Sequence, residues 1–266
     1  RYADGSLWHL HNTGQSGGVV DADIDGPEAW DTMRHATNIL VAIVDTGVRY
    51  THEDLAANMW VNSGEIPGNG VDDDGNGYID DVHGINAAAN DGNPIDLHGH
   101  GTQVAGLAGA VGDNGKGGTG VAWSVQLMAL RFFDDAGNGY TSDAAECIDY
   151  ARLQGAHIIN ASFGSPSSSS TLSSAINSAR NAGIIVVAAA ANDGSDNDTT
   201  PVYPASYTHD NIVAVAATTR TDALASYSNY GATSVDLGAP GSDLYTTARS
   251  SDSAYTKGSG TSFATP

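Results

Sequence analysis

Five stretches of the chain are predominantly apolar and have the length of a β-strand, without alternation of apolar and polar positions. Strands that are buried on both faces of a sheet show this pattern, as in parallel sheets. The stretches are also rich in β-branched side chains, which favours strands. We therefore predict buried, parallel strands at residues 38–44, 125–130, 157–160, 183–191 and 212–216.

Two amphipathic stretches of helical length, residues 142–154 and 171–182, lie between these runs. The first begins with Ser142 as a predicted cap and an acidic first turn, and Gly155 follows its end. Gly183 ends the second stretch in the same way. Alternating strands and helices predict an α/β protein, with helices on both faces of a mostly parallel central sheet. We expect one domain over residues 1–266, because no repeat or linker divides the chain.

Polar residues follow three of the predicted strands directly, where each strand ends. Asp45 follows the first strand, Ser162 lies just beyond the third, and Asn192 follows the fourth. Functional residues of open α/β folds gather beyond the carboxyl ends of the strands. The sequence therefore predicts a functional site at this edge of the sheet.

Composition and charge exclude several classes of function. Asp and Glu number 31 against 10 Lys and Arg, which gives a formal net charge of −21. Binding to nucleic acids or to anionic membranes requires clustered positive charge, so we expect neither partner. The longest apolar run, residues 184–191, is far shorter than the ~20 residues that span a bilayer. Cys147 is the single cysteine, which excludes an intramolecular disulfide and is typical of a small core residue.

Two polar motifs are ambiguous when each is considered alone. Asp45-Thr46-Gly47 fits a turn acid held by backbone amides, and an aspartic peptidase would need a second such motif, which the chain lacks. His98 and His100 lie two residues apart, but no third soft ligand nearby supports a zinc site. The small residues after His100 instead predict the start of a closely packed helix, with His100 facing a cleft.

A third motif, residues 258–266 (GSGTSFATP), predicts a sharp turn into a helix that exposes the hydroxyl of Ser262 near the positive helix end. Asp45, His100 and Ser262 follow one another in the order Asp, His, Ser known from subtilisin. The chain resembles the subtilisin-like serine peptidases, the subtilases, along essentially its whole length. The resemblance rests on VAIVDTGV, HGHGTQVAG, IINASFG, VVAAAAND and GSGTSFATP, and also on WHLHNTGQ and VDLGAPG.

The resemblance implies a subtilisin-like three-layer α/β/α sandwich and a catalytic triad. Ser262 would be the nucleophile, His100 its general base and later the acid, and Asp45 the residue that orients the imidazole. Asn192 would donate its side-chain amide to the oxyanion of the tetrahedral intermediate. The backbone N–H of Ser262 would be the second donor, with Thr261 as a weaker contributor.

The resemblance also implies a groove for an extended peptide. Its backbone would pair with two short segments, and a pocket with small walls and an apolar base would prefer apolar or aromatic side chains. Tyr140 and Phe163 would border a second apolar pocket. The segments are Ser162, Phe163 and Gly164 on one side and Gly137, Asn138 and Gly139 on the other; the first pocket is formed by Ala189, Ala190 and Val202.

The acidic segment 72–81 (DDDGNGYIDD) predicts a calcium site. Its oxygen-bearing side chains have the spacing of an EF-hand loop, with a backbone carbonyl at the seventh position. His83 occupies the place of the usual Glu at position twelve, and Asp81 could complete the ligand set. A solvated acidic turn is the alternative. The predicted ligands are Asp72, Asp74, Asn76, Tyr78 through its carbonyl, Asp80 and Asp81.

The subtilase resemblance implies a second calcium site near the N-terminus. Asp4 and Asp54 would provide carboxylates, and Asn114 would bind through its side chain. Val111, Lys116 and Gly118 would provide backbone carbonyls. Structural calcium would stabilise a chain without disulfides. Asp91, Asp96, Asp193, Asp196 and Asp198 are weaker candidates, for which a solvated loop is the favoured interpretation.

Three features depart from the family pattern. Ala191 stands where a Gly usually precedes the oxyanion Asn, which stiffens that loop or narrows the pocket. Phe263 replaces the Met usually found beside the nucleophile. The sequence ends at Pro266, whereas subtilases continue with a buried helix, so we expect the catalytic domain to lack its C-terminal portion here. Arg1 in place of Met predicts a processed or trimmed chain.

Together these features predict a secreted, calcium-stabilised serine endopeptidase. It would act on proteins or peptides as a monomer and would carry an N-terminal propeptide before maturation. One alternative is a processing subtilase of narrow specificity, which acidic pocket residues would favour. Another is a catalytically silent, subtilase-like binding domain.

Overall fold

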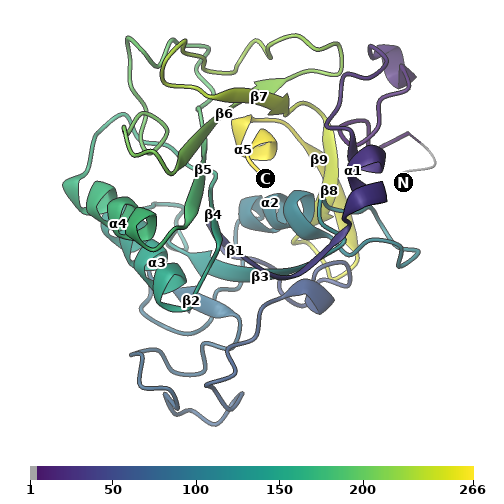
Figure 1. The fold of residues 1–266 in the computed structure, drawn as a ribbon. Coiled ribbons are helices and arrows are strands. Elements are labelled where there is room, and N and C mark those ends of the chain that lie inside the picture. Colours follow the sequence, from purple (N-terminus) through teal and green to yellow (C-terminus); the bar gives the residue numbers. More distant parts are fainter. Residues whose placement is uncertain (1–4) are drawn as a thin grey trace.

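A computed structural model describes residues 5–266, and its centre is a seven-stranded sheet with the order β2-β3-β1-β4-β5-β6-β7 (Figure 1). All neighbouring strands of this sheet are parallel. The predicted apolar runs correspond to β1, β3, β4, β5 and β6, which confirms the parallel α/β fold. The strands are β1 (His35–Asp45), β2 (Gly84–Asn86), β3 (Ser124–Arg131), β4 (Ile158–Ala161), β5 (Ile185–Ala189), β6 (Ile212–Thr218) and β7 (Leu237–Pro240).

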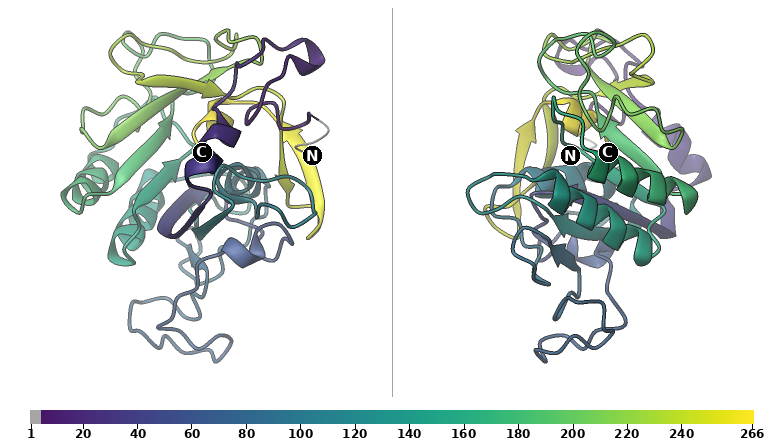
Figure 2. Two further views of the ribbon diagram at one scale, coloured as in Figure 1. Left: turned by 45° about the vertical axis from the view of Figure 1, so that its right-hand side comes forward. Right: turned by 90° about the vertical axis from the view of Figure 1, so that its left-hand side faces the viewer.

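Helices cover both faces of the sheet, so the predicted three-layer sandwich is confirmed. In β1, the side chains of Leu40, Ala42 and Val44 pack in the cluster beneath α3 and α4, whereas Ile43 packs beneath α2. Figure 1 shows α3 and α4 on one side of the sheet with α2 and α5 on the other, and Figure 2 shows the same layers from two further directions. The helices are α1 (Gly26–Thr32), α2 (His100–Gly109), α3 (Thr141–Leu153), α4 (Ser170–Asn181) and α5 (Thr261–Ala264), with short 3-10 turns η2 (Gln15–Gly17) and η3 (Ala56–Asn58).

The predicted end of the helix at 142–154 is confirmed, but its predicted cap is wrong. Helix α3 begins at Thr141, one residue before Ser142, and its N-cap residue is Tyr140, without a side-chain hydrogen bond to the helix. Ser142 lies inside the first turn and donates to the Asp143 carboxylate. Helix α4 begins at Ser170, one residue before the predicted stretch, and its cap is Ser169, which accepts a hydrogen bond from the backbone N–H of Leu172 (3.3 Å).

An antiparallel hairpin of β8 (Leu244–Ala248) and β9 (Ala254–Gly258) packs beside α2. Thr246 and Thr247 donate their hydroxyls to the carbonyls of Gln103 and Thr102 in α2. The hairpin approaches so closely at Gly106 that a Cβ there would lie 2.3 Å from the Thr247 hydroxyl oxygen. This contact fixes the helix that carries His100 against the segment that leads to Ser262.

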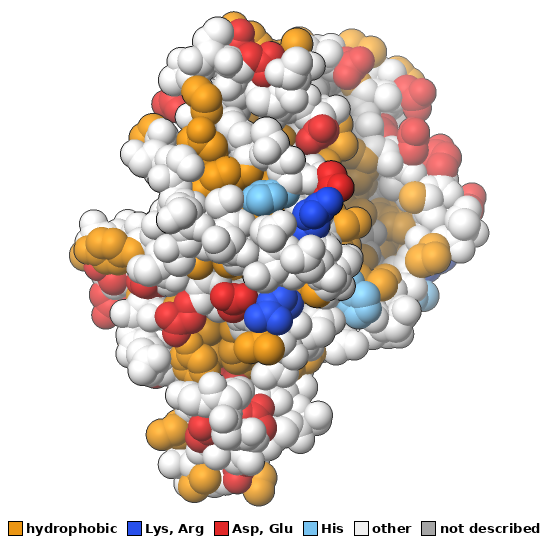
Figure 3. Space-filling model, turned by 60° about the vertical axis from the view of Figure 1, so that its left-hand side comes forward, with side chains coloured by type: hydrophobic (Ala, Val, Ile, Leu, Met, Phe, Trp, Pro, Cys, Tyr) orange, Lys and Arg blue, Asp and Glu red, His pale blue; other side chains and the backbone are white. Residues whose placement is uncertain are grey.

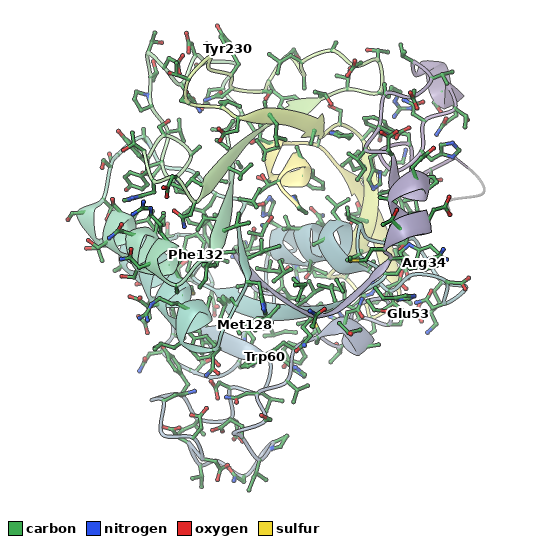
Figure 4. All side chains as sticks on the ribbon, in the orientation of Figure 1. Arg34, Glu53, Trp60, Met128, Phe132 and Tyr230 are labelled. Atoms are coloured by element: carbon green, nitrogen blue, oxygen red, sulfur yellow. The ribbon has the colours of Figure 1, made fainter. Side chains whose placement is uncertain are left out.

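The surface agrees with the acidic composition. Figure 3 shows acidic side chains scattered over one face, with basic side chains at few places. None of the helices within residues 5–266 is long and apolar enough to cross a membrane. Cys147 lies on the buried face of α3 and belongs to the core, as predicted. Figure 4 shows Met128 and Phe132 of the same cluster in the molecule's interior.

Candidate active site

The end of β1 brings Asp45 against the first residue of α2, His100. Asp45 is almost fully buried, and both of its carboxylate oxygens lie within hydrogen-bond distance of His100 Nδ1, at 2.8 and 2.9 Å. The backbone N–H of Thr46 donates to the same carboxylate (2.7 Å). Because the carboxylate accepts from Nδ1–H, the other ring nitrogen, Nε2, is left as the acceptor.

Asp96 fixes the start of α2 relative to the end of β1. Its buried carboxylate accepts hydrogen bonds from the backbone N–H groups of Gly99 (2.7 Å) and Thr102 (3.0 Å). It also accepts from the hydroxyl of Thr46 (3.0 Å), which in turn accepts from the N–H of Gly101 (2.9 Å). Asp96 therefore lies in a capping network beside Asp45 and His100, a role that its sequence context did not indicate.

The Asp45 carboxylate raises the pKa of His100 above its ordinary value. Burial of the ring acts in the opposite direction, and the charge of Asp96 adds to the effect of Asp45. The carboxylate thus stabilises the imidazolium that forms when His100 accepts a proton.

Ser262 lies in the first turn of α5, beside His100. Its hydroxyl donates to the backbone carbonyl of Ser162 (3.1 Å), while the hydroxyl of Ser162 donates to the carbonyl of Ser262 (3.0 Å). Within residues 5–266, no hydrogen bond joins Ser262 to His100. Catalytic hydrogen bonds of ligand-free enzymes are often long and shorten on substrate binding. The ring of Phe263, the residue after Ser262, meets the His100 ring edge-on, with centroids 6.1 Å apart, so the start of α5 packs against the start of α2.

Asn192 lies in the loop after β5, and Thr261 orients its side chain. The Asn192 Oδ1 accepts from the backbone N–H of Thr261 (2.8 Å) and from its hydroxyl (3.2 Å). Because the oxygen is engaged in this way, Nδ2 is the remaining polar group of the Asn192 amide, and Asn192 and Ser262 line the same pocket. Thr261 is fully buried, and both of its donors point to Asn192.

A pocket of about 510 Å³ opens next to Ser262 and Asn192. Most of the predicted residues line it, whereas Ala190 does not and instead accepts a hydrogen bond on its carbonyl from Asn197 (2.8 Å). Sequence reasoning missed Pro166 and Asp193 as lining residues. The lining consists of Ser162, Phe163, Gly164, Pro166, Ala189, Ala191, Asn192, Asp193, Val202, Thr261 and Ser262.

The second predicted segment for substrate, residues 137–139, forms a tight loop before α3. The Asp134 carboxylate accepts from the backbone N–H of Asn138 (2.8 Å), which closes the loop. A Cβ on Gly137 would lie 3.1 Å from the ring of His98, so the loop packs near the start of α2. Tyr140 is 61% exposed at the cap of α3.

The acidic segment after Trp60 brings three carboxylates together. Oxygens of Glu65, Asp74 and Asp81 lie within 4.8 Å of one another. Asn62 donates its amide to both Asp74 (3.0 Å) and Asp81 (3.1 Å). Within residues 5–266, none of the three carboxylates forms an ion pair with Lys or Arg. Glu65 was not predicted, because EF-hand spacing places the distant Glu after the loop, whereas this Glu precedes it.

The other predicted ligands of this loop have different surroundings. Asn76 donates its amide to Asp81 (2.8 Å) and so belongs to the cluster. Asp72 accepts from backbone N–H groups of its own loop, such as that of Gly75 (2.8 Å). Asp80 turns away and accepts from the N–H groups of residues 68–70, so the structure does not bring it to the three carboxylates. The backbone N–H of Tyr78 donates to the Asn76 side chain (2.9 Å).

Asp54 is the central predicted ligand of the second calcium site. Its carboxylate is fully buried and accepts from Asn114 Nδ2 (2.5 Å), from Tyr255 (3.0 Å) and from the N–H of Gly118 (3.3 Å). The backbone N–H of Val111 donates to the Asp54 carbonyl (2.8 Å). No ion pair with a basic side chain of residues 5–266 compensates its charge. Asp4 lies outside the described residues, and Lys116 pairs with Glu53 (3.0 Å).

Serine hydrolases rely on a carboxylate, an imidazole, a serine hydroxyl and an amide donor. Here Asp45 pairs with His100, and the helix α5, which carries Ser262, packs against both His100 and Asn192. A sequence profile of the subtilase family (Peptidase_S8) matches residues 36–266, so the chain belongs to the subtilase family.

Individual relatives agree with this assignment. The chain is 41% identical to the thermophilic serine proteinase of Bacillus sp. (strain AK1), over 90% of this chain and 52% of that protein. It is 40% identical to thermitase of Thermoactinomyces vulgaris, over 91% of this chain and 76% of that protein. The structure of a protease from Pseudoalteromonas arctica PAMC 21717 superposes with a TM-score of 0.75 at 31% identity, covering 97% of this chain and 81% of the other. The chain thus spans about half the length of the Bacillus proteinase.

Proposed function

We propose that this chain is a serine endopeptidase that hydrolyses protein and peptide substrates through an acyl-enzyme. The observation that carries the proposal is the Asp45–His100 pair, against which α5 packs through the ring of Phe263, the residue after Ser262. His100 Nε2 accepts the hydroxyl proton as Ser262 attacks the scissile carbonyl, and then donates it to the leaving amine. Water repeats the sequence to release the acyl group.

Donors on two sides stabilise the oxyanion in this mechanism. Asn192 Nδ2 is the side-chain donor, because Thr261 engages the amide oxygen and Asn192 lines the pocket beside Ser262. The backbone N–H of Ser262 is the second donor. Thr261 contributes mainly by orienting Asn192, since both of its own donors are already engaged.

An extended peptide would lie between the backbone of residues 162–164 and that of residues 137–139, as an added strand. The pocket between Gly164, Ala189 and Val202 would receive the side chain of the residue whose carbonyl is attacked. Its mostly apolar lining supports a preference for apolar or aromatic side chains, and Tyr140 with Phe163 would border a further apolar pocket. Asp193 at the pocket favours a second candidate, a narrow-specificity enzyme that selects basic side chains.

A fluorophosphonate probe tests the proposed function, because it reacts only with an activated serine. We expect one labelled peptide, containing Ser262, and digestion of casein that the probe abolishes. Peptide substrates with Leu, Phe or Arg at the attacked position then separate the two specificities. An unlabelled but folded protein would instead support the silent binding domain.

We also propose structural calcium at both acidic sites. The buried, unpaired Asp54 and the clustered Glu65, Asp74 and Asp81 fit a cation that prefers oxygen ligands, because uncompensated carboxylates repel one another. Asp72, Asn76 and the Tyr78 carbonyl remain candidate ligands of the loop, whereas Asp80 would have to leave the N–H groups of residues 68–70 to join them. At the other site the candidates are Asp4, Asn114 and the carbonyls of Val111, Lys116 and Gly118. We propose in addition that the protein is secreted and matures from an N-terminal propeptide, where bound calcium would stabilise a chain that has no intramolecular disulfide.

Chelation should lower stability. A ligand at a thousand times its dissociation constant stabilises by about 4 kcal/mol, so EGTA should lower the Tm by about 10 °C. Scanning fluorimetry with calcium, EGTA, or EGTA with added Mg²⁺ measures this shift. Asp54→Asn and Asp81→Asn should each reduce the response to EGTA, whereas Asp149→Asn on α3 should not. A Tm that does not respond to EGTA would remove calcium from the proposal.

Because Phe263 stands beside the proposed nucleophile, we predict that the activity of this protein resists oxidation. The Phe263 ring lies over Gly258, where a Cβ would be 2.1 Å from Cζ. Neither sequence neighbour of Ser262, Thr261 or Phe263, carries a sulfur atom. Met oxidation converts an apolar thioether into a polar sulfoxide. We expect activity to survive peroxide treatment that inactivates Phe263→Met, with Phe263→Leu as the matched control. Equally rapid loss in all three proteins would show that another group is the target.

A further inference from the structure

Ala191, between β5 and the oxyanion residue Asn192, has a backbone conformation that alanine rarely adopts. Its φ is 87°, in the left-handed region that favours glycine. Residues held in such conformations persist only where the surrounding structure determines them, and they gather at ligand sites.

Hydrogen bonds on both sides hold Ala191 in this conformation. Its N–H donates to the hydroxyl of Thr261 (3.2 Å), and its carbonyl accepts from the N–H of Asn229 (2.9 Å). The buried Asn229 also accepts from the N–H groups of Asp193 (2.8 Å) and Ser195 (3.1 Å), and it donates to the buried Asn197 (2.9 Å). The loop is therefore fixed, and the direction of the Ala191 methyl group is fixed with it.

The methyl group projects toward the opposite wall of the pocket beside Ser262. Ala191 Cβ lies only 3.9 Å from the position that a Cβ on Gly164 would occupy. That hypothetical Cβ would be one C–C bond, about 1.5 Å, from Gly164 Cα. The Ala191 methyl carbon and Gly164 Cα are therefore at most about 5.4 Å apart. An aromatic ring that contacts both walls needs about 7 Å between their carbon atoms.

We propose that the Ala191 methyl group is a specificity determinant that excludes aromatic side chains from this pocket and admits slender apolar ones. An aromatic ring is broad and would occupy the full width of the pocket, so the Ala191 methyl group at one point of the wall is enough to exclude it. An unbranched side chain is narrower and can pass beside the methyl group. This inference rests on the proposed peptidase function and narrows its apolar or aromatic preference to slender side chains.

The test compares peptide p-nitroanilides that differ only in Met or Phe at the attacked position. Ala191→Gly removes the methyl group, and glycine tolerates the left-handed backbone. We expect the ratio of kcat/KM for Phe over Met to rise about tenfold or more in this variant. Asp222→Gly is the matched control, because Asp222 also has a positive φ (60°) but lies outside the pocket lining. It should leave the ratio unchanged.

Titration with the fluorophosphonate probe gives the concentration of active sites in each protein. Labelled proteins with the same ratio in the parent and in Ala191→Gly would overturn this inference while the proposed function stands. A parent that already prefers Phe over Met would overturn it as well. A folded parent that is not labelled would overturn the proposed function, and this inference with it.

Discussion

Replacement of Ser262 by alanine is expected to abolish almost all hydrolysis of casein and peptides. In the related enzyme subtilisin, loss of the nucleophile lowers kcat by about 10⁶, and we expect a loss of that order here. The reason is that His100 and Asp45 act only through the hydroxyl that they activate, so the pair has no function without it. The remaining rate over water would come from Asn192 and from substrate binding.

The fold should tolerate this substitution, which makes the result interpretable. The Ser262 hydroxyl donates only to the Ser162 carbonyl, an acceptor at the edge of the pocket. We therefore expect a Tm within a few degrees of the parent's. Ser178→Ala on α4, where the hydroxyl donates to Ser174 (3.0 Å), is the matched control and should keep full activity. A folded Ser262→Ala protein with a rate comparable to the parent's would contradict the proposed triad.

The central sheet of the fold could be predicted from the sequence because a continuous apolar run indicates a strand that is buried on both of its faces. Because side chains alternate along a strand, the sequence also indicates which side chains of β1 face one layer of helices and which face the other. The end of α3 was predicted for the same local reason, since Gly155 adopts a φ of 77°. The start of α3 was not, because Ser142 is a good cap residue that tertiary packing places inside the helix.

In the candidate site, too, residues within local sequence motifs could be predicted, whereas residues that approach from distant parts of the chain could not. Asp45, His100, Asn192 and Ser262 could be predicted as site residues because each lies in a motif that extends over several neighbours. Glu65 and Asp193 were missed because the path of the chain brings them to their sites, and no motif spacing indicates it. The same is true of Asn229, whose contacts with the Ala191–Ser195 loop join residues more than thirty positions apart.

Replacement of Asp45 by asparagine should lower kcat near neutral pH by about 10⁴. An asparagine Oδ1 could still accept the backbone N–H of Thr46, which would direct its Nδ2 toward His100 Nδ1. His100 Nδ1 would then have to accept a hydrogen bond, so its proton would move to Nε2. In that tautomer Nε2 cannot take the proton of Ser262. Asp149→Asn makes the same chemical change on the surface of α3 and should leave kcat unaltered.

The pH profile distinguishes this role of Asp45 from a merely structural one. Catalysis needs neutral His100, and Asp45 raises the pKa of that residue, so the parent's kcat/KM should fall as pH drops through a value above the ordinary histidine pKa. Without the carboxylate the largest cause of the raised pKa is gone while the ring stays buried, so the pKa of His100 should fall relative to the parent's. The acid limb of the Asp45→Asn profile should therefore move to lower pH, although the rate itself falls. An acid limb at the parent's position would show that another group controls it, because a loss of fold alone changes the amplitude of the profile and not its midpoint.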